Sequence, residues 1–142
     1  MRQRPAIDRW FKANHVEDIL ASLETNAAAG PGSDGDLART LAATIRAKSP
    51  LSLKLALALQ RRGRTLAFDE CMRTEYRVVS RVVRGHDFYE GIRAVIIDKD
   101  QAPNWQPPAL AAVSEAEVER HFAPVTRELD LPELDLPELD LP

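Results

Sequence analysis

The stretch RGHDFYEGIRAVIIDKDQAPNWQP, residues Arg84–Pro107, carries the densest set of structural signals in the chain. Gly85 can adopt the left-handed conformation that ends a helix. Asp87 and Glu90 have the spacing of a capping box at the start of the next helix. Apolar side chains then recur on one helical face, at Phe88, Ile92, Val95 and Ile96. The pattern predicts a helix over about residues 88–98 whose apolar face packs on a core.

Prolines follow this helix at positions 103, 107 and 108, and proline cannot continue a helix. Trp105 lies between them and is expected to be an aromatic anchor. No part of the stretch contains a complete catalytic constellation. It therefore indicates a scaffold rather than an active site.

Helical signals continue on both sides of this stretch. They predict helices around Ile7–Phe11, at about 15–25 behind an Asn14 cap, from a Ser33 and Asp36 cap to near Lys48, at about 66–84, and at about 115–122 behind a Ser114–Glu117 capping box. The fold class predicted is all-α, with about six to seven helices in an irregular helical domain and an extended acidic tail.

The segment LSLKLALALQRR, residues 51–62, fits two templates. Its leucines alternate with period two, which is typical of a strand. Its composition is rich in strong helix formers and contains no β-branched residue. Ser49-Pro50 before it is typical of a helix start, and Gly63 after it is typical of a helix end. We therefore predict a helix that is buried on much of its circumference.

The chain divides into four predicted parts. Residues 1–26 form an N-terminal helical pair, 27–36 a Gly/Pro loop, 37–122 the main helical region, and 123–142 an acidic tail. The tail contains ELDLP three times without a change, and proline at every fifth position excludes a long helix. We expect it to be extended and disordered, with a leucine-bearing docking peptide as the alternative.

Charge is distributed unevenly along the 142 residues. Six of the 22 acidic side chains lie in residues 128–142 without a base, which leaves 19 basic against 16 acidic side chains in residues 1–127, a net charge of +3. This bias is too weak to argue for nucleic acid, which is an unlikely partner.

The chain shows no apolar run of the length that crosses a bilayer and no secretory signal, so a membrane is not an expected partner. A single cysteine, Cys71, cannot form an internal disulfide and fits a reducing compartment. The expected location is the cytoplasm, or the mitochondrial matrix if the protein is eukaryotic and N-terminally truncated.

Few residues offer chemistry of their own. The histidines, His15, His86 and His121, are far apart and, with Cys71, show no metal-ligand spacing, so we expect no metal site. Asp98-Lys99-Asp100 is interpreted as a solvated turn rather than an acid–base pair. Arginines recur along one helix face, at Arg73, Arg77, Arg81 and Arg84, and could hold phosphate. The favoured interpretation is a solvated face paired with Glu75 or Asp87, and a phosphate-binding face is the alternative.

The segment Glu75–Pro107 resembles the C-terminal region of 3-hydroxyisobutyryl-CoA hydrolases, which belong to the enoyl-CoA hydratase/isomerase (crotonase) superfamily. RGHDF-x-EG-x-RA followed by IDKDQ-x-P-x-W-x-P is the specific part, whereas EG-x-RA alone is shared widely. The resemblance continues through KSPLSLK (48–54), IDRWFKAN (7–14) and VEDIL (16–20), and covers about residues 7–122.

This resemblance implies a helical portion of a hydrolase that acts on 3-hydroxyisobutyryl-CoA in valine breakdown. In that family an N-terminal β/α spiral core holds the oxyanion hole and the acidic groups, and it would lie upstream of Ile7. No catalytic residue is therefore assigned here, and we expect the isolated chain to be inactive. Coenzyme A would enter as part of the substrate, with no separate cofactor. By analogy, Asp98, Lys99 and Trp105 are expected near the CoA or acyl end of a complete site.

Three alternatives stay open. One is a portion of an enoyl-CoA hydratase or isomerase, which IDKDQAPNWQP argues against. Another is a non-enzymatic assembly module, which would associate with itself or with a crotonase-type core through its apolar faces, Trp10, Phe11, Leu51–Leu59 and Phe88–Ile96. The third is a basic helical nucleic-acid binder resting on the arginine face alone. Whether the chain is a fragment, half of a split gene or a whole product is left open by its sequence.

Overall fold

The computed structural model describes residues 3–30 and 32–131, and all regular structure in these ranges is helical. The elements are α1 (Arg4–Trp10), α2 (Val16–Ala28), α3 (Ser33–Arg46), α4 (Pro50–Gly63), α5 (Phe68–Val82), α6 (His86–Ile92), the π-helix η1 (Arg93–Ile97), the 3-10 turn η2 (Leu110–Ala112) and α7 (Glu115–Phe122). The all-α prediction is confirmed. Within the described ranges, no helix combines the length and apolar character needed to span a membrane.

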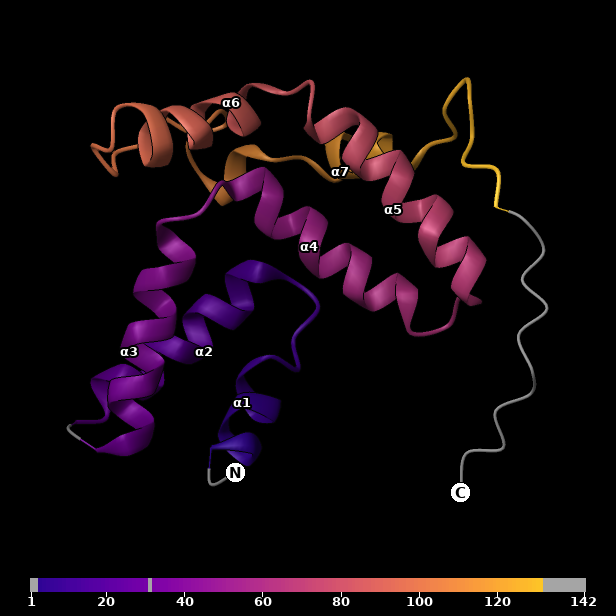
Figure 1. Cartoon of the computed structure of the whole chain (residues 1–142). Helices are drawn as coiled ribbons and strands as arrows, with labels where there is room; N and C mark the ends of the chain where they lie inside the picture. The colour runs from indigo at the N-terminus through magenta and orange to yellow at the C-terminus, as the bar shows by residue number, and fades with distance from the viewer. Residues whose placement is uncertain (1–2, 31, 132–142) are drawn as a thin grey trace.

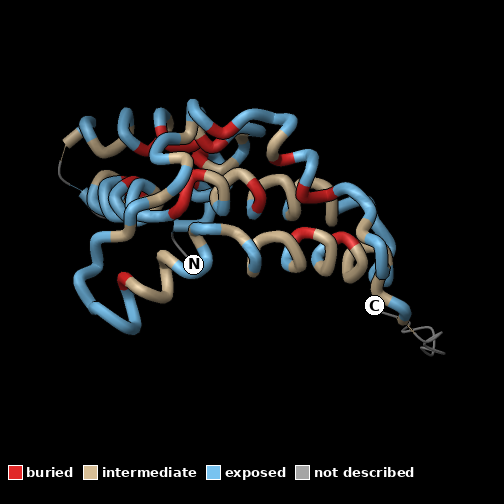
Figure 2. The backbone as a smooth tube through the Cα atoms, turned by 90° about the horizontal axis from the view of Figure 1, so that it is seen from above, coloured by how far each residue is buried: buried red, intermediate tan, exposed pale blue. Residues whose placement is uncertain are grey.

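The helices form two packed groups joined through α4 (Figure 1). Helices α1, α2 and α3 surround one cluster, in which the side chains of Trp10 and Leu23 are completely buried. Helices α4, α5 and α7 surround the other, whose buried members are Leu55, Val78, Val113, Val118 and Phe122. Figure 2 shows buried positions as short separate patches along the tube, with exposed backbone between them. The apolar residues are thus divided between two small cores.

The alternative of an assembly module expects Trp10 and Phe11 to lie on an exposed apolar face. Trp10 is 0% exposed within the first cluster, and Phe11 is half-buried against the same cluster. The expectation is therefore wrong for Trp10, because α2 and α3 already cover it. This burial removes one of the surfaces on which an assembly module would rely.

The ambiguous segment 51–62 is helical, as predicted. Ser49 is the N-cap of α4, and its Oγ accepts the backbone N–H of Ser52 at 3.1 Å. Pro50 occupies the first helical position, where no intrahelical partner is lost. The cap and the helix formers prevail over the period-two pattern because Leu55 points into the second core while its neighbouring leucines are half-buried.

Several helix ends differ from those predicted. Helix α2 continues to Ala28 and α3 begins at Ser33, so the connection between them is shorter than the predicted loop 27–36. Alanine favours the helix strongly enough to carry the first part of AAAGPGS into α2. Asn14 does not cap α2, whose N-cap residue is His15, without a side-chain hydrogen bond. The longest helix, α5, spans 68–82 rather than 66–84.

The end of the described chain lies against α5. Helix α7 has the predicted bounds, and Ser114 Oγ accepts the N–H of Glu117 at 3.1 Å, as half of the predicted capping box. Residues 123–131 are irregular, and Glu128 in the first ELDLP repeat contacts Arg77 Nε at 3.0 Å. The rest of the predicted tail, residues 132–142, lies outside the described residues.

Lys54 joins three segments and is the clearest single tie between the two groups of helices. Its Nζ lies 2.8 Å from Glu17 Oε1 on α2 and donates to the backbone oxygen of Val113 at 3.1 Å. The Lys54 side chain is 21% exposed, so solvent screens this contact only in part. Lys54 therefore couples α2, α4 and the segment before α7.

We expect Lys54→Met to lower the free energy of unfolding by about 1–2 kcal/mol, because it leaves the Val113 carbonyl without its donor and Glu17 without its partner. Urea denaturation followed by circular dichroism measures this change. Arg4→Gln is the matched control, because the Arg4–Asp8 pair is long at 3.7 Å and largely exposed. It should change stability by less than about 0.5 kcal/mol. Equal effects of the two substitutions would contradict the role given to Lys54.

Candidate functional site

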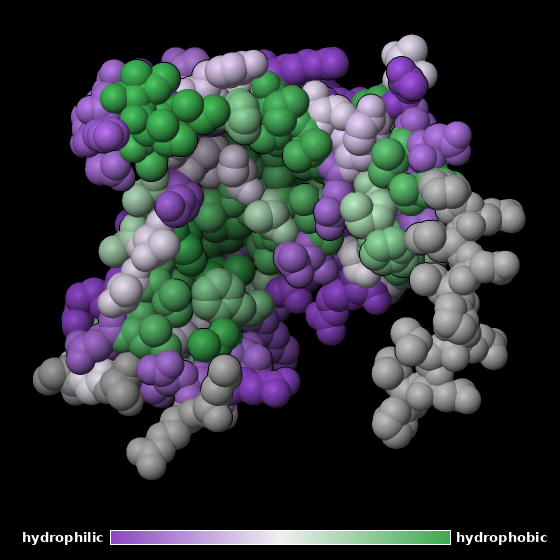
Figure 3. Space-filling model, in the orientation of Figure 1, coloured by the Kyte–Doolittle hydropathy of each residue, from purple (hydrophilic) through white to green (hydrophobic). Residues whose placement is uncertain are grey.

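A predominantly apolar groove of about 630 Å³ lies between the start of α4, helix α6, η1 and the loop that carries Trp105. Its apolar lining includes Leu53, Phe88, Ile92, Val95, Ile96 and Trp105. Figure 3 shows apolar surface gathered over α6 and η1 and continuing into the hollow beside them. This groove is formed largely by the stretch Arg84–Pro107.

The apolar face predicted for residues 88–96 does not pack on a core within the described chain. Phe88 is 40% exposed, Val95 53% and Ile96 63%. The helix also changes character, because residues 93–97 form a π-helix after the α-helical turn of α6. The β-branched residues Val95, Ile96 and Ile97 lie in this π-helical turn, and Ile97 is 68% exposed. The face is therefore a surface and not part of either core.

Trp105 anchors the far wall of the groove, as its position between prolines predicted. Its Nε1 donates to the backbone oxygen of Ala47 at 3.1 Å, which ties the loop to the connection between α3 and α4. Its ring lies against Gly91, where an added Cβ would stand 3.3 Å from the ring atom Cη2. Gly91 therefore allows the close approach of the indole to α6.

Asp87 joins three segments instead of capping a helix. Its carboxylate accepts the Ser49 hydroxyl at 2.5 Å and the backbone N–H of Gln106 at 2.8 Å, and lies 3.1 Å from His86 Nδ1. Gly85, and not Asp87, is the N-cap residue of α6, with extended angles of φ −84° and ψ 159°. The prediction of a left-handed Gly85 is therefore wrong. The prediction of a capping box at Asp87 is also wrong, because the Ser49 hydroxyl and the Gln106 N–H donate to its carboxylate instead.

Arg93 organises the loop after η1. Its guanidinium contacts both oxygens of Glu90, at 2.8 and 2.9 Å, and donates to Asp98 at 2.7 Å and Asp100 at 2.6 Å. Glu90 also accepts the N–H of Asn104 at 2.7 Å. The hydrogen bonds from Arg93 and Asn104 lower the pKa of Glu90 from 4.5 to about 2. The same arginine lowers the pKa of Asp100, and the three carboxylates raise the pKa of Arg93.

The three residues expected near coenzyme A occupy different surroundings. Trp105 lines the groove, whereas Asp98 is bound to Arg93 and neither Asp98 nor Lys99 lines the groove. Lys99 is exposed and adopts the left-handed conformation, with φ 57°. The prediction that these residues lie near a CoA or acyl group stays a prediction. Ser49 and Gly91 also line the groove, and the sequence did not predict this role. The available signal was their position in the motifs KSPLSLK and EG-x-RA, respectively.

The predicted arginine face runs along α5 and just beyond it, through Arg73, Arg77, Arg81 and Arg84. Arg73 pairs with Asp69 at 2.7 Å, and Arg77 pairs with Glu128 at 3.0 Å. Arg77 also reaches Glu70 at 3.2 Å. The favoured interpretation, pairing with Glu75 or Asp87, is therefore wrong for these two residues. Their partners are carboxylates on α5 itself and in the first ELDLP repeat.

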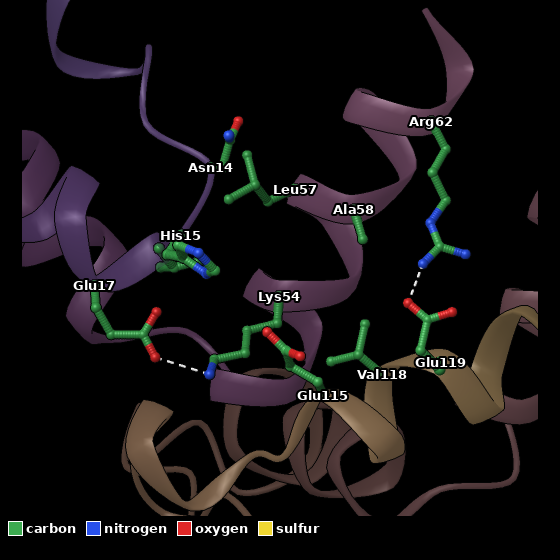
Figure 4. Close-up of a pocket in the computed structure, with 11 residues that line it drawn as sticks. Asn14, His15, Glu17, Lys54, Leu57, Ala58, Arg62, Glu115, Val118 and Glu119 are labelled. Atoms are coloured by element: carbon green, nitrogen blue, oxygen red, sulfur yellow. Dashed lines mark hydrogen bonds and ion pairs between the residues drawn. The ribbon is translucent and has the colours of Figure 1, made fainter. Parts of the chain in front are cut away.

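A second pocket, of about 330 Å³, lies where α2, α4 and α7 meet (Figure 4). The Lys54–Glu17 pair spans it on one side, and the Arg62–Glu119 pair lies on the other. His15 projects into the same region from the start of α2. The two ion pairs each connect different helices, so we interpret the pocket as a structural contact between helices. Throughout residues 3–30 and 32–131, no group of three or more His, Cys, Asp or Glu side chains could hold a metal ion.

Glu90→Gln tests the network around Arg93. Because folding lowers the pKa of Glu90, its ionised form stabilises the protein above pH 4.5, and this contribution is lost as the pH falls toward 2. The melting temperature of the parent should therefore fall more steeply between pH 4.5 and 2 than that of Glu90→Gln. Circular dichroism melts across this range measure it. Glu75→Gln, at an exposed position on α5, should keep the parent slope, and parallel slopes for all three proteins would refute the role of Glu90.

Comparison with known proteins shows which family the chain resembles. The family model described as enoyl-CoA hydratase/isomerase matches residues 1–122. The mitochondrial 3-hydroxyisobutyryl-CoA hydrolase of Danio rerio is 42% identical over 85% of this chain and 30% of its own length. Small ribosomal subunit protein mS47 of Arabidopsis thaliana is 43% identical over 87% of this chain and 30% of its own length.

A solved structure agrees with these relatives. The carnitinyl-CoA dehydratase of Mycobacterium thermoresistibile matches with a TM-score of 0.76 and 37% identity, over 91% of this chain and 35% of that one. The chain thus spans about a third of the length of the proteins that it matches. The resemblance drawn from the Glu75–Pro107 segment is confirmed, and this chain belongs to the enoyl-CoA hydratase/isomerase family.

Proposed function

We propose that this chain forms the helical portion of a CoA-thioester hydrolase that acts on 3-hydroxyisobutyryl-CoA. The exposed apolar groove of Trp105 is the observation that carries the proposal. An apolar surface of this kind, formed by residues that identify the hydrolase branch, is suited to cover a catalytic core and the acyl group bound there. The relative from Danio rerio, named as such a hydrolase, supports the choice of substrate.

The charged groups beside the groove agree with a covering role. Asp87 is held by the Ser49 hydroxyl and the Gln106 N–H, and Glu90 by Arg93 and the Asn104 N–H. The lowered pKa of Glu90 makes it a poor proton acceptor at neutral pH. The water activation and the oxyanion stabilisation would come from a β/α core, and this chain would exclude water from the site.

Coenzyme A would reach the complete site as part of the substrate. Trp105 would lie beside the acyl end, because its ring forms a wall of the groove. Asp98 and Lys99 would lie farther along the loop, with the exposed Lys99 available to an anionic part of the ligand. The name of the hydrolase from Danio rerio includes "mitochondrial", which supports the mitochondrial matrix over the cytoplasm as the location proposed for this protein.

A chimera tests the proposed function. The segment of the Danio rerio hydrolase that matches this chain is replaced by the chain itself, and release of free thiol from 3-hydroxyisobutyryl-CoA is followed. We expect the chimera to hydrolyse the thioester, and the isolated chain to give no release above the substrate alone. Ile96→Asp in the chimera should reduce kcat/KM at least tenfold, because it places a charge on the covering surface (about 1.4 kcal/mol or more).

Val79→Asp is the matched control, because Val79 is 53% exposed on α5 and does not line the groove. It should keep the activity of the parent chimera. A folded chimera without thioesterase activity, or equal losses in the two variants, would count against the proposal. Hydration of crotonyl-CoA without thiol release would instead support the enoyl-CoA hydratase alternative.

A non-enzymatic assembly module is the second candidate. It is favoured by the relative named as a small ribosomal subunit protein, which is 43% identical to this chain. In that role the exposed residues of η1 would contact another protein without covering a catalytic site.

Sedimentation velocity over a hundredfold range of concentration tests this candidate. Association through the groove should give a weight-average sedimentation coefficient that rises with concentration, and Ile96→Asp should abolish the rise while Val79→Asp keeps it. A monomer at every concentration that also fails to bind a crotonase-type core would exclude the module.

A further inference from the structure

The arginines of α5 fall into two groups with different surroundings. Arg73 and Arg77 are neutralised by carboxylates, as described above. Arg81 and Arg84 lie at the C-terminal end of the helix and make no ion pair with a described carboxylate. Both line a separate pocket of about 360 Å³, which Arg127 enters from the chain after α7. Two arginines from the end of α5 and one from the chain after α7 thus line one concave site.

The composition of this pocket favours an anion. Its lining includes three residues that carry a hydroxyl group, Tyr76, Ser80 and Thr126, and no acidic residue among those described. Each hydroxyl can donate a hydrogen bond, and the three arginines carry a formal charge of about +3. Glu128, the next residue after Arg127, is turned to Arg77 and the N–H of Val125. The nearest acidic residue in the sequence is therefore already engaged.

The backbone holds Arg81 in place at the base of the site. Its Nη1 donates to the backbone oxygens of Arg77, His121 and Ala123, and its Nη2 donates to the oxygen of Pro124 at 3.0 Å. Neutral carbonyl partners fix the position of the guanidinium without cancelling its charge. A charge fixed before binding loses less entropy when a ligand arrives.

The end of a helix ordinarily repels anions because of its free carbonyl groups. Here the carbonyls of Val79, Arg81 and Val82 accept the N–H groups of Val83, Arg84 and Gly85, at 2.9 to 3.1 Å. Their negative potential is thereby reduced at the edge of the pocket. The remaining field comes mainly from the arginines.

We propose that Arg81, Arg84 and Arg127 form a binding site for a phosphate group, either as free phosphate or as a phosphomonoester on a larger molecule. Guanidinium groups match the geometry of phosphate oxygens and form charge-assisted hydrogen bonds with them. The hydroxyl groups of Ser80 and Thr126 complete the donor set. This proposal revises the predicted phosphate face, because it removes Arg73 and Arg77 and adds a residue beyond the helix.

Isothermal titration calorimetry of the full chain with inorganic phosphate tests the site, at constant ionic strength set with chloride. We expect saturable binding, and we expect Arg84→Gln and Arg127→Gln each to weaken it about tenfold through the loss of a charged donor. Arg64→Gln, at an exposed arginine after α4, is the matched control and should keep the parent affinity. Both test positions are exposed, so folding should survive, and a circular dichroism melt of each variant confirms this.

Adenosine 3′-monophosphate and adenosine distinguish the source of the phosphate. Binding of the monoester with equal or higher affinity, without binding of adenosine, supports a phosphomonoester, whereas binding of inorganic phosphate alone supports the free ion. No saturable binding of either phosphate compound overturns the proposal. Equal weakening by Arg64→Gln and Arg84→Gln overturns it as well, because it would show a general effect of charge. None of these measurements uses a thioester, so they are independent of the proposed hydrolase function.

Discussion

The carboxylate of Asp87 is the interaction on which the groove depends. It binds the Ser49 hydroxyl 38 residues away at the start of α4 and the Gln106 N–H 19 residues away in the Trp105 loop. Ser49 also caps α4, so one hydroxyl serves both the helix start and the tertiary contact. With Asp87 10% exposed, these hydrogen bonds form with little competition from water. The orientation of α6 and η1 relative to α4 follows from them.

Hydrogen bonds and ion pairs of charged side chains add to the stabilisation that the two small cores provide. Each of the two hydrophobic clusters has few fully buried members, and long arginine and lysine side chains tie the surrounding segments together. Arg61 donates to the backbone oxygens of Phe11, Lys12 and Ala13, and Arg93 gathers the loop after η1. The Arg61 contacts hold the connection between α1 and α2, and the Arg93 contacts hold the loop that borders the groove. The apolar groups of η1 stay exposed at its rim, where a partner surface would contact them.

Helices were predictable where local signals agreed. Ser49-Pro50 and Ser114 begin helices as expected, because a cap acts within one turn and needs no distant partner. The predictions of helix caps failed where a polar side chain could bind either the start of a helix or another group. Asp87 and Asn14 both have the character of caps, yet neither caps a helix, and the capping of α6 is left to Gly85. The groove was visible only as an apolar face, because its walls come from segments that are distant in sequence, 38 residues apart at Ser49 and Asp87 and 58 at Ala47 and Trp105.

The sequence by itself determined the all-α class, the helix positions to within a few residues and, through RGHDF-x-EG-x-RA and IDKDQ-x-P-x-W-x-P, the family. These properties depend on neighbouring residues and on motifs that are contiguous. Only the tertiary structure decided which apolar residues are covered: Trp10 is enclosed by α2 and α3, while Ile96 and Ile97 are exposed. It also separated the paired arginines from those that share a pocket with Arg127, because burial and pairing depend on which distant segments meet.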